Sequence, residues 1–149
     1  MREFDCVIYG QPPSAKNQRQ IVKIGGISRL IKSKKALAYV KEFESQCPSL
    51  GELITGDVSV RVDVYYQSRR PDLACMDLIM DLLQGKVYEN DRQVKASMSI
   101  WNLDRENPRA SISVRSINTE NLLGLSSLKH SEIWDASGQR RTELPLEDL

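Results

Sequence analysis

Histidine and cysteine are scarce in this sequence, and their scarcity restricts the chemistry that the chain can perform. The single histidine, His130, argues against a Cys/His zinc site and against a Ser–His–Asp triad. The three cysteines, Cys6, Cys47 and Cys75, are widely spaced and odd in number. They argue against a disulfide framework, so we expect a protein of the reducing cytoplasm.

Long hydrophobic runs are also missing. No apolar stretch approaches the roughly 20 residues that a membrane-spanning helix needs, and the first ten residues contain no signal-peptide hydrophobic region. The chain has 149 residues, of which 40% are hydrophobic and 28% are charged. This composition predicts one globular domain with a real core and no membrane partner.

The net charge of +1 conceals an uneven distribution of charge along the chain. Eight basic residues and no acidic one lie between Ser14 and Lys41, whereas residues 117–149 contain three basic and six acidic residues. A basic N-terminal third is typical of a protein that binds a polyanion, although a solvated basic face gives the same pattern. The phosphate-binding candidates are Lys16, Arg19, Lys23, Arg29, Lys32, Lys34 and Lys35, together with Arg69 and Arg70.

Hydrophobic periodicity predicts an α/β protein of the α+β type, with a small mixed sheet, a basic hairpin and two main helices. Ser33 is a plausible N-cap for the first helix, and Gly25-Gly26 indicates the hairpin turn. Residues 118–149 have weak periodicity, and we expect a C-terminal extension there with a short helix and a tail. The expected strands are 3–9, 20–24, 27–31, 58–66, 94–103 and 109–117, and the expected helices are 34–46 and 72–84.

Four aspartates fall within twenty residues, at Asp72, Asp77, Asp81 and Asp91, and large apolar residues separate them. Carboxylates on an apolar scaffold are costly unless they are solvated, paired or bound to a metal. A pair of arginines at 69 and 70 precedes them, which indicates a site for a divalent cation and a phosphate. A purely structural role is the alternative, in which Asp72 caps the second helix and Asp81 pairs with Lys86 or Arg92.

Magnesium suits such carboxylates, because it is a hard ion that takes oxygen ligands in octahedral geometry. One or two of these ligands are usually carboxylates, and water and substrate phosphate supply the rest. Asp77 and Asp81 are four residues apart and therefore share one face of the predicted helix. Hydrolysis of a phosphodiester needs a metal to polarise the phosphoryl group and to acidify a water molecule. All four aspartates are therefore catalytic candidates.

Three segments of the chain form a recognisable pattern: Arg69-Arg70-Pro71-Asp72-Leu73, Asp81-Leu82-Leu83-Gln84-Gly85 and Val87-Tyr88-Glu89-Asn90-Asp91-Arg92-Gln93-Val94. Together they resemble the RusA family of Holliday junction resolvases. The family typically shows Arg-Arg-x-Asp-Leu-Asp-Asn, then a helix ending Asp-x-Leu-x-Gly, then an aromatic residue and Asp-Asp-x-Gln-Val. Pro12-Pro13-Ser14 with Asn17, and Ala38-Tyr39, are also similar to the family pattern, so the likeness covers roughly residues 3–117.

The resemblance implies a homodimeric endonuclease that makes paired nicks in four-way junctions or related branched DNA. It implies Mg²⁺, with Mn²⁺ as a substitute, and no nucleotide or organic cofactor. By position, Asp72 would be the first metal ligand, Asp91 the third, and Asp81 the conserved helical aspartate. We therefore expect a RusA-like nuclease domain over residues 1–117, followed by the extension, in the cytoplasm of a bacterial or phage-infected cell.

The chain departs from the family pattern where the second metal ligand is expected. That position holds Ala74, the next asparagine is replaced by Cys75, and a helical lysine is replaced by Asp77. The interval from Asp72 to Asp81 is also one residue shorter than usual. One explanation is that Asp77 has become a metal ligand, because a one-residue shift turns a helical side chain by about 100°. Alternatively, the protein binds branched DNA without cutting it, or Ala74 is an introduced substitution.

Overall fold

A four-stranded mixed sheet forms the centre of the protein, seen in a computed structural model that describes residues 2–14 and 17–118. Its strands follow the order β1-β6-β4-β5, in which β4 and β5 are parallel and the other neighbours are antiparallel. All four strands agree with the sequence-based expectation to within one residue. Their bounds are β1 Glu3–Tyr9, β4 Val58–Tyr66, β5 Val94–Leu103 and β6 Arg109–Ser116.

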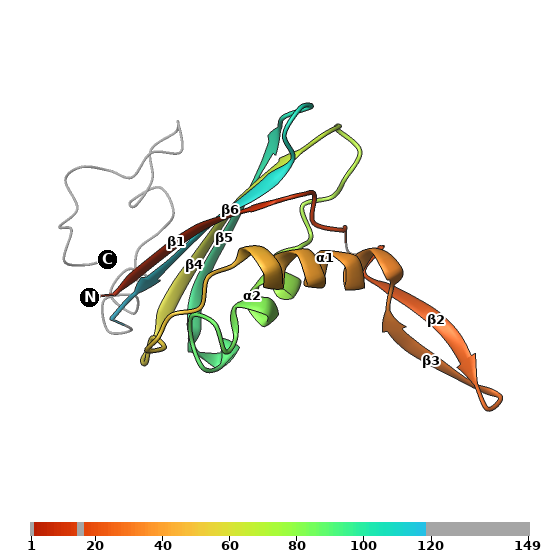
Figure 1. Cartoon of the computed structure of the whole chain (residues 1–149), viewed down its shortest axis with the longest axis horizontal. Coiled ribbons are helices and arrows are strands. Elements are labelled where there is room, and N and C mark those ends of the chain that lie inside the picture. Colours follow the sequence, from red (N-terminus) through yellow and green to blue (C-terminus); the bar gives the residue numbers. More distant parts are fainter. Residues whose placement is uncertain (1, 15–16, 119–149) are drawn as a thin grey trace, which may run out of the picture.

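One face of the sheet carries the core. On β4, the side chains of Val58, Val60, Val62 and Val64 are at most 1% exposed, whereas Arg61 between them is exposed. Burial of each valine contributes roughly 1.5–3 kcal/mol relative to an exposed position. Figure 1 shows both α-helices of the described chain on the same side of the sheet, which explains this alternation.

The first helix, α1, spans Lys34–Gln46 and begins as predicted. The Ser33 hydroxyl oxygen accepts a hydrogen bond from the Ala36 backbone N–H at 3.1 Å, which satisfies one of the free donors of the first turn. Tyr39 and Phe43 are buried on the helix face that packs against the sheet. This helix therefore closes one end of the core and places its N-terminus beside the hairpin.

The second helix begins later than predicted. It is α2, which spans Met76–Leu83 with Cys75 as its N-cap, so the expectation that it starts at Asp72 was wrong. The Tyr66 hydroxyl and the Ala74 N–H both donate to the Asp72 carbonyl oxygen, each at 3.0 Å. Because these contacts occupy an acceptor that a longer helix would use, Asp72 lies on a loop and does not cap the helix.

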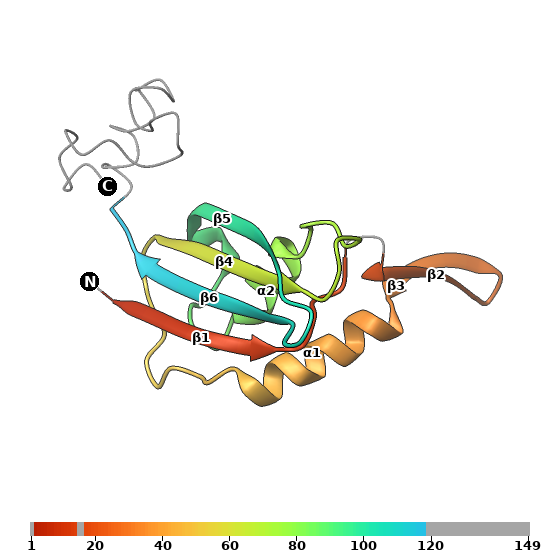
Figure 2. The ribbon, with the colours of Figure 1, turned by 90° about the horizontal axis from the view of Figure 1, so that it is seen from above.

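The hairpin stands apart from the main sheet. Its strands β2 (Arg19–Ile24) and β3 (Ile27–Lys32) pair only with each other among the described strands, as predicted from the sequence. Gly25 and Gly26 have φ values of 58° and 79°, as two-residue hairpin turns with a right-handed twist require. In Figures 1 and 2 the hairpin projects from the N-terminal end of α1, at the end of the molecule opposite the N-terminus.

The fold is thus of the mixed α+β kind that the sequence predicted, with six strands in two sheets and two α-helices over the described residues. Two expectations concern parts of the chain outside these residues: the phosphate contact from Lys16, and the short helix and tail of the C-terminal extension. Within the described ranges, no helix has the length and apolar character needed to cross a membrane.

Candidate nuclease site

Three of the four candidate aspartates line one cavity of about 290 Å³, which we call the acidic cavity. Asp77 and Asp81 reach it from α2, and Asp91 reaches it from a short 3-10 turn, η2 (Asp91–Gln93). Arg19 and Lys32, at the base of the hairpin, form its cationic side. The full lining consists of Gln18, Arg19, Lys32, Ala36, Asp77, Leu78, Asp81 and Asp91.

Gln84, which lies outside the cavity lining, joins the helix to the turn by binding two of the aspartates. Its side-chain amide donates to Asp81 Oδ1 at 2.9 Å, and its carbonyl oxygen accepts from the Asp91 N–H at 3.1 Å. Lys32 Nζ lies 3.9 Å from Asp81 Oδ2, and both side chains are about half exposed, so this ion pair is weak. The ion-pair partner of Asp81 is therefore Lys32, and neither Lys86 nor Arg92 was the right alternative.

Asp91 is held in place by the side chains on either side of it. The Asn90 side chain caps η2 by accepting from the Arg92 N–H at 2.9 Å. The side-chain oxygen Oε1 of Gln93 accepts hydrogen bonds from the backbone N–H groups of Glu89 and Asn90. The Gln93 amide also donates to the carbonyl oxygens of residues 54 and 56 at 2.9 and 2.8 Å. The turn is therefore tied to the body of the protein and presents Asp91 to solvent.

A buried tyrosine also supports α2. The Tyr88 hydroxyl donates to the Met80 carbonyl oxygen of α2 at 2.6 Å, and the whole side chain is buried. Burial, followed by the negative charges of Asp91 and Asp81, raises the pKa of the Tyr88 phenol. The phenol therefore keeps its proton at neutral pH and remains a donor to α2.

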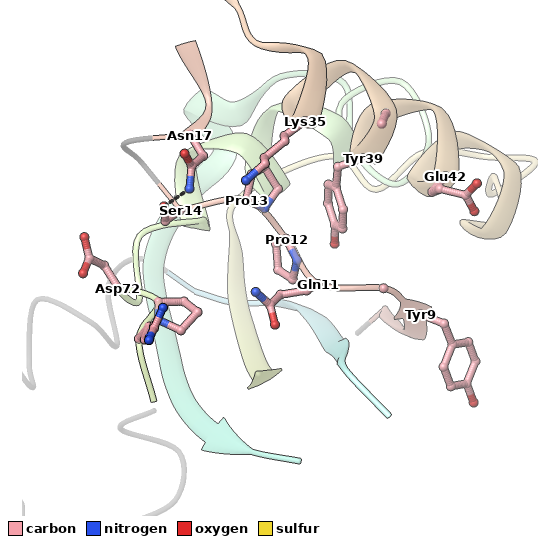
Figure 3. A pocket seen from close by; sticks show the side chains of 14 residues that line it. Tyr9, Gln11, Pro12, Pro13, Ser14, Asn17, Lys35, Tyr39, Glu42 and Asp72 are labelled. Carbon is pink, nitrogen blue, oxygen red and sulfur yellow. Dashed lines mark hydrogen bonds between the residues drawn. The ribbon is translucent and has the colours of Figure 1, made fainter. Parts of the chain in front are cut away.

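The fourth aspartate, Asp72, lines a second cavity of about 620 Å³ (Figure 3). This cavity lies between α1 and the segment that follows β1. Lys35 and Arg70 also line it, so two more of the phosphate-binding candidates lie beside Asp72. In Figure 3 the Tyr39 ring extends from α1 toward Gln11 and Pro12 on the opposite wall.

The loop that carries Asp72 is fixed to the C-terminal ends of β4 and β5. The Tyr66 hydroxyl binds the Asp72 carbonyl oxygen, and the Trp101 indole N–H donates to the Pro71 carbonyl oxygen at 3.2 Å. The rings of Tyr66 and Trp101 stack with centroids 5.9 Å apart. Asp91 precedes the start of β5 at Val94, and since β4 and β5 are parallel, the two aspartates are anchored to opposite ends of this strand pair.

The structure therefore divides the predicted carboxylates into two sets. Asp77, Asp81 and Asp91 share the acidic cavity, and Asp72 lies in the neighbouring one. Gln18 separates the cavities, because its amide donates to the carbonyl oxygens of residue 13 at 2.9 Å and residue 74 at 2.8 Å. Among the described residues, no three Asp, Glu, His or Cys side chains lie close enough together to form a ready-made metal site.

The hairpin has two different faces. Residues paired across an antiparallel ribbon share a face, and faces alternate along each strand. The pairs Arg19–Lys32, Ile21–Leu30 and Lys23–Ser28 form one face, which we call the cationic face. Because Arg19 and Lys32 line the acidic cavity, this face continues outward from it. Arg29 pairs with Val22 and lies on the opposite face, away from the other hairpin cations.

Sequence reasoning missed the glutamines that hold the site together. Gln93 and Asn90 form a capping box, whose spacing of an Asn followed three residues later by a Gln was visible in the sequence. Gln18 and Gln84 gave no such signal, because their partners are carbonyls and carboxylates that only the folded chain brings near them. The remaining predicted cations, Lys34 and Arg69, are exposed and lie outside both cavity linings.

Comparison with known proteins identifies the family. The pattern of the Endodeoxyribonuclease RusA family matches residues 11–115, which is more than half of the chain and includes every residue that lines the acidic cavity. The chain therefore belongs to the RusA family, as the sequence motifs indicated, and this places it among endonucleases that act on Holliday junctions. A search among curated proteins finds no match.

Proposed function

We propose that this protein is a metal-dependent, structure-selective endonuclease that resolves Holliday junctions or related branched DNA by phosphodiester hydrolysis. The observation that carries the proposal is the acidic cavity, in which three carboxylates face two cations at the root of a projecting basic hairpin. The carboxylates are suitable ligands for a hard metal ion. The basic side chains are suitable for binding the DNA phosphate that must lie beside that metal ion. The three cysteines of the described residues are free, which supports our placing it in the cytoplasm of a bacterial or phage-infected cell.

The proposed metal ligands are Asp77 and Asp91. Asp72, which the family resemblance also implies as a ligand, lies in the neighbouring cavity and would have to move toward the acidic cavity to join them. No hydrogen bond or ion pair engages the Asp77 or Asp91 carboxylates within residues 2–14 and 17–118, so both have oxygens to offer. Asp81 is already held by Gln84 and Lys32, and its proposed role is to keep the hairpin and η2 in place. Two carboxylates suffice for Mg²⁺ or Mn²⁺, which would polarise the phosphoryl group and acidify a water molecule.

DNA binding would rest on phosphate contacts along the cationic face, extended by Lys35 and Arg70 at the second cavity. Each neutralised phosphate on duplex DNA contributes about −0.9 to the slope of log K against log salt concentration. No helix of the described chain projects as a base-reading element, which supports recognition of shape over sequence. Arg19 and Lys32 would hold the phosphate nearest the acidic cavity.

The two faces of the hairpin provide a matched test of this binding mode. Lys23→Glu reverses a charge on the cationic face, so we expect weaker junction binding and a salt slope reduced by about 0.9 or more. Arg29→Glu reverses the same charge on the opposite face and should have a smaller effect on both quantities. Fluorescence anisotropy titrations at several salt concentrations measure the two variants. Equal losses would show that the hairpin does not bind DNA through one face.

We also propose a homodimer, because symmetric cuts across a four-way junction need two active sites related by a twofold axis. The strands β1 and β5 are the edges of the main sheet, and Val7 and Tyr9 on β1 are about half exposed. These features support pairing with a second copy. Sedimentation equilibrium of the free protein should give twice the chain mass of 16.9 kDa, and a mass of one chain with junction DNA bound would contradict the proposal.

A second candidate function is junction binding without cleavage. Two observations favour it: Ala74 stands where the family pattern has an acidic ligand, and Asp72 lies apart from the other three aspartates. A synthetic four-way junction with one labelled strand distinguishes the two functions. Nicking with Mg²⁺ or Mn²⁺ that disappears with EDTA supports the nuclease, and salt-sensitive junction binding without nicking under either metal selects the binding protein.

A further inference from the structure

The cationic face of the hairpin carries an exposed apolar pair between its charges. Ile21 is 73% exposed and Leu30 is 58% exposed, and the two residues are cross-strand partners. The Arg19–Lys32 pair lies on the proximal side of them and the Lys23–Ser28 pair lies on the distal side. Ile21 and Leu30 are not part of the hydrophobic core. Exposed apolar surface of this kind between charged residues is typical of an interaction site.

The spacing of this face fits one strand of DNA. Successive pairs on the same face of a strand are separated by two residues, or about 7 Å. Arg19 and Lys23 are therefore about 13 Å apart along β2, and the Ile21–Leu30 pair lies midway between them. Nucleotides of one DNA strand advance about 3.4 Å along the helix axis. The cations can therefore contact phosphates roughly four nucleotides apart, while the apolar pair lies midway between these phosphates along the strand.

We propose that Ile21 and Leu30 form an apolar wedge that inserts against unstacked bases at the branch point of DNA. This inference rests on the proposed function. It names the part of the protein, the Ile21–Leu30 pair, by which the proposed nuclease would distinguish branched from duplex DNA. Apolar side chains inserted between base steps must overcome base stacking, which costs free energy in an intact duplex. At a branch point the stack is already interrupted, so the same insertion costs less and favours the junction.

The wedge also places the branch relative to the acidic cavity. Arg19 and Lys32 line that cavity and lie one same-face step, or about 7 Å, from the apolar pair. Seven ångströms corresponds to about two nucleotides of one strand. The geometry therefore favours cuts within about two or three nucleotides of the branch point.

Two double substitutions on the same hairpin test the proposal. Ile21→Ser with Leu30→Ser removes the wedge and leaves every cation in place. Ile24→Ser with Ile27→Ser is the matched control, because these residues are also cross-strand partners, are 55% and 61% exposed, and lie on the opposite face. Binding is measured by anisotropy in EDTA on a four-way junction and on a duplex of the same sequence. The junction also carries 2-aminopurine at its centre, whose fluorescence rises when the base is unstacked.

We expect the wedge variant to lose about tenfold in junction affinity, to keep its duplex affinity and to lose the 2-aminopurine signal. The control variant should keep the wild-type preference for the junction and its signal. Wild-type behaviour of the wedge variant, or equal losses in both variants, would overturn the proposal. So would a fall in the sedimentation mass of the wedge variant, because the pair would then contact a second copy of the chain. If the wild-type protein itself shows no junction preference, the proposed function fails together with the wedge.

Discussion

Asp91→Asn should abolish junction cleavage while leaving junction binding within about twofold of wild type. The substitution keeps the size of the side chain and the backbone N–H that Gln84 binds at 3.1 Å, so the η2 turn should stay folded. It removes the negative charge that we propose to hold the metal. Loss of a metal ligand that supplies about 4 kcal/mol of transition-state stabilisation lowers the rate roughly 10³-fold, at about 1.36 kcal/mol for each factor of ten.

Single-turnover cleavage of a labelled junction, with binding measured in EDTA, tests this expectation. Glu89→Gln is the matched control, because Glu89 is an exposed acidic residue two positions away that lines neither cavity. Its cleavage rate should equal that of the wild type. Undiminished cleavage by Asp91→Asn would remove Asp91 from the proposed metal site, and a parallel loss of binding would assign it to DNA contact.

Ala74→Asp should raise the cleavage rate by about 10- to 100-fold, which is the range in which supporting groups at metal sites change affinity or activity. Ala74 is half-buried on the loop between β4 and α2, and its carbonyl oxygen is held by Gln18 at 2.8 Å. The backbone at this position is therefore fixed by contacts that do not involve the side chain. A carboxylate added there would stand two residues after Asp72, on a residue whose backbone is bound by Gln18 of the acidic cavity.

Combining this change with Asp77→Asn distinguishes the explanations for the alanine. If Asp77 has replaced the missing ligand, Asp77→Asn should inactivate the wild-type background and have much less effect in the Ala74→Asp background. Such non-additivity is the signature of two groups that serve one function. Equal effects of Asp77→Asn in both backgrounds would show that Asp77 does not substitute for the missing ligand. No cleavage in any combination would favour the binding protein over the nuclease.

The strands, the hairpin and the first helix were predictable because their determinants are local. The alternation along β4, the Gly25-Gly26 turn and the Ser33 cap each lie within a few residues of the structure that they specify. The start of α2 was not predictable in this way. The start of α2 depends on two hydrogen bonds from other parts of the chain. The Tyr66 hydroxyl donates to the Asp72 carbonyl oxygen, and the Trp101 indole N–H, 30 residues away, donates to the Pro71 carbonyl oxygen.

In the candidate site too, features with local determinants were predictable and features that depend on distant parts of the chain were not. The sequence identified which side chains are acidic and which are basic, and it correctly placed Asp77 and Asp81 together, since helical spacing alone determines that. It did not predict that Asp72 lies in a different cavity from Asp91. That separation follows from the parallel pairing of β4 with β5, which anchors the two residues at opposite ends. Local hydrophobic periodicity predicts single strands, but it does not show which distant strands pair with each other.

The assembly of the acidic cavity from distant segments has a consequence for how the protein folds. The cavity needs the hairpin base, α2 and η2 at once, and Arg19 is far from Asp91 in sequence. Contacts of large sequence separation form slowly, because a long loop must be closed before they contribute any stabilisation. The complete set of three carboxylates and two cations therefore needs these long-range contacts, although Asp77 and Asp81 already share one face of α2. A partly folded chain in which the hairpin base has not yet reached α2 and η2 therefore lacks the complete acidic cavity with which to capture a cation.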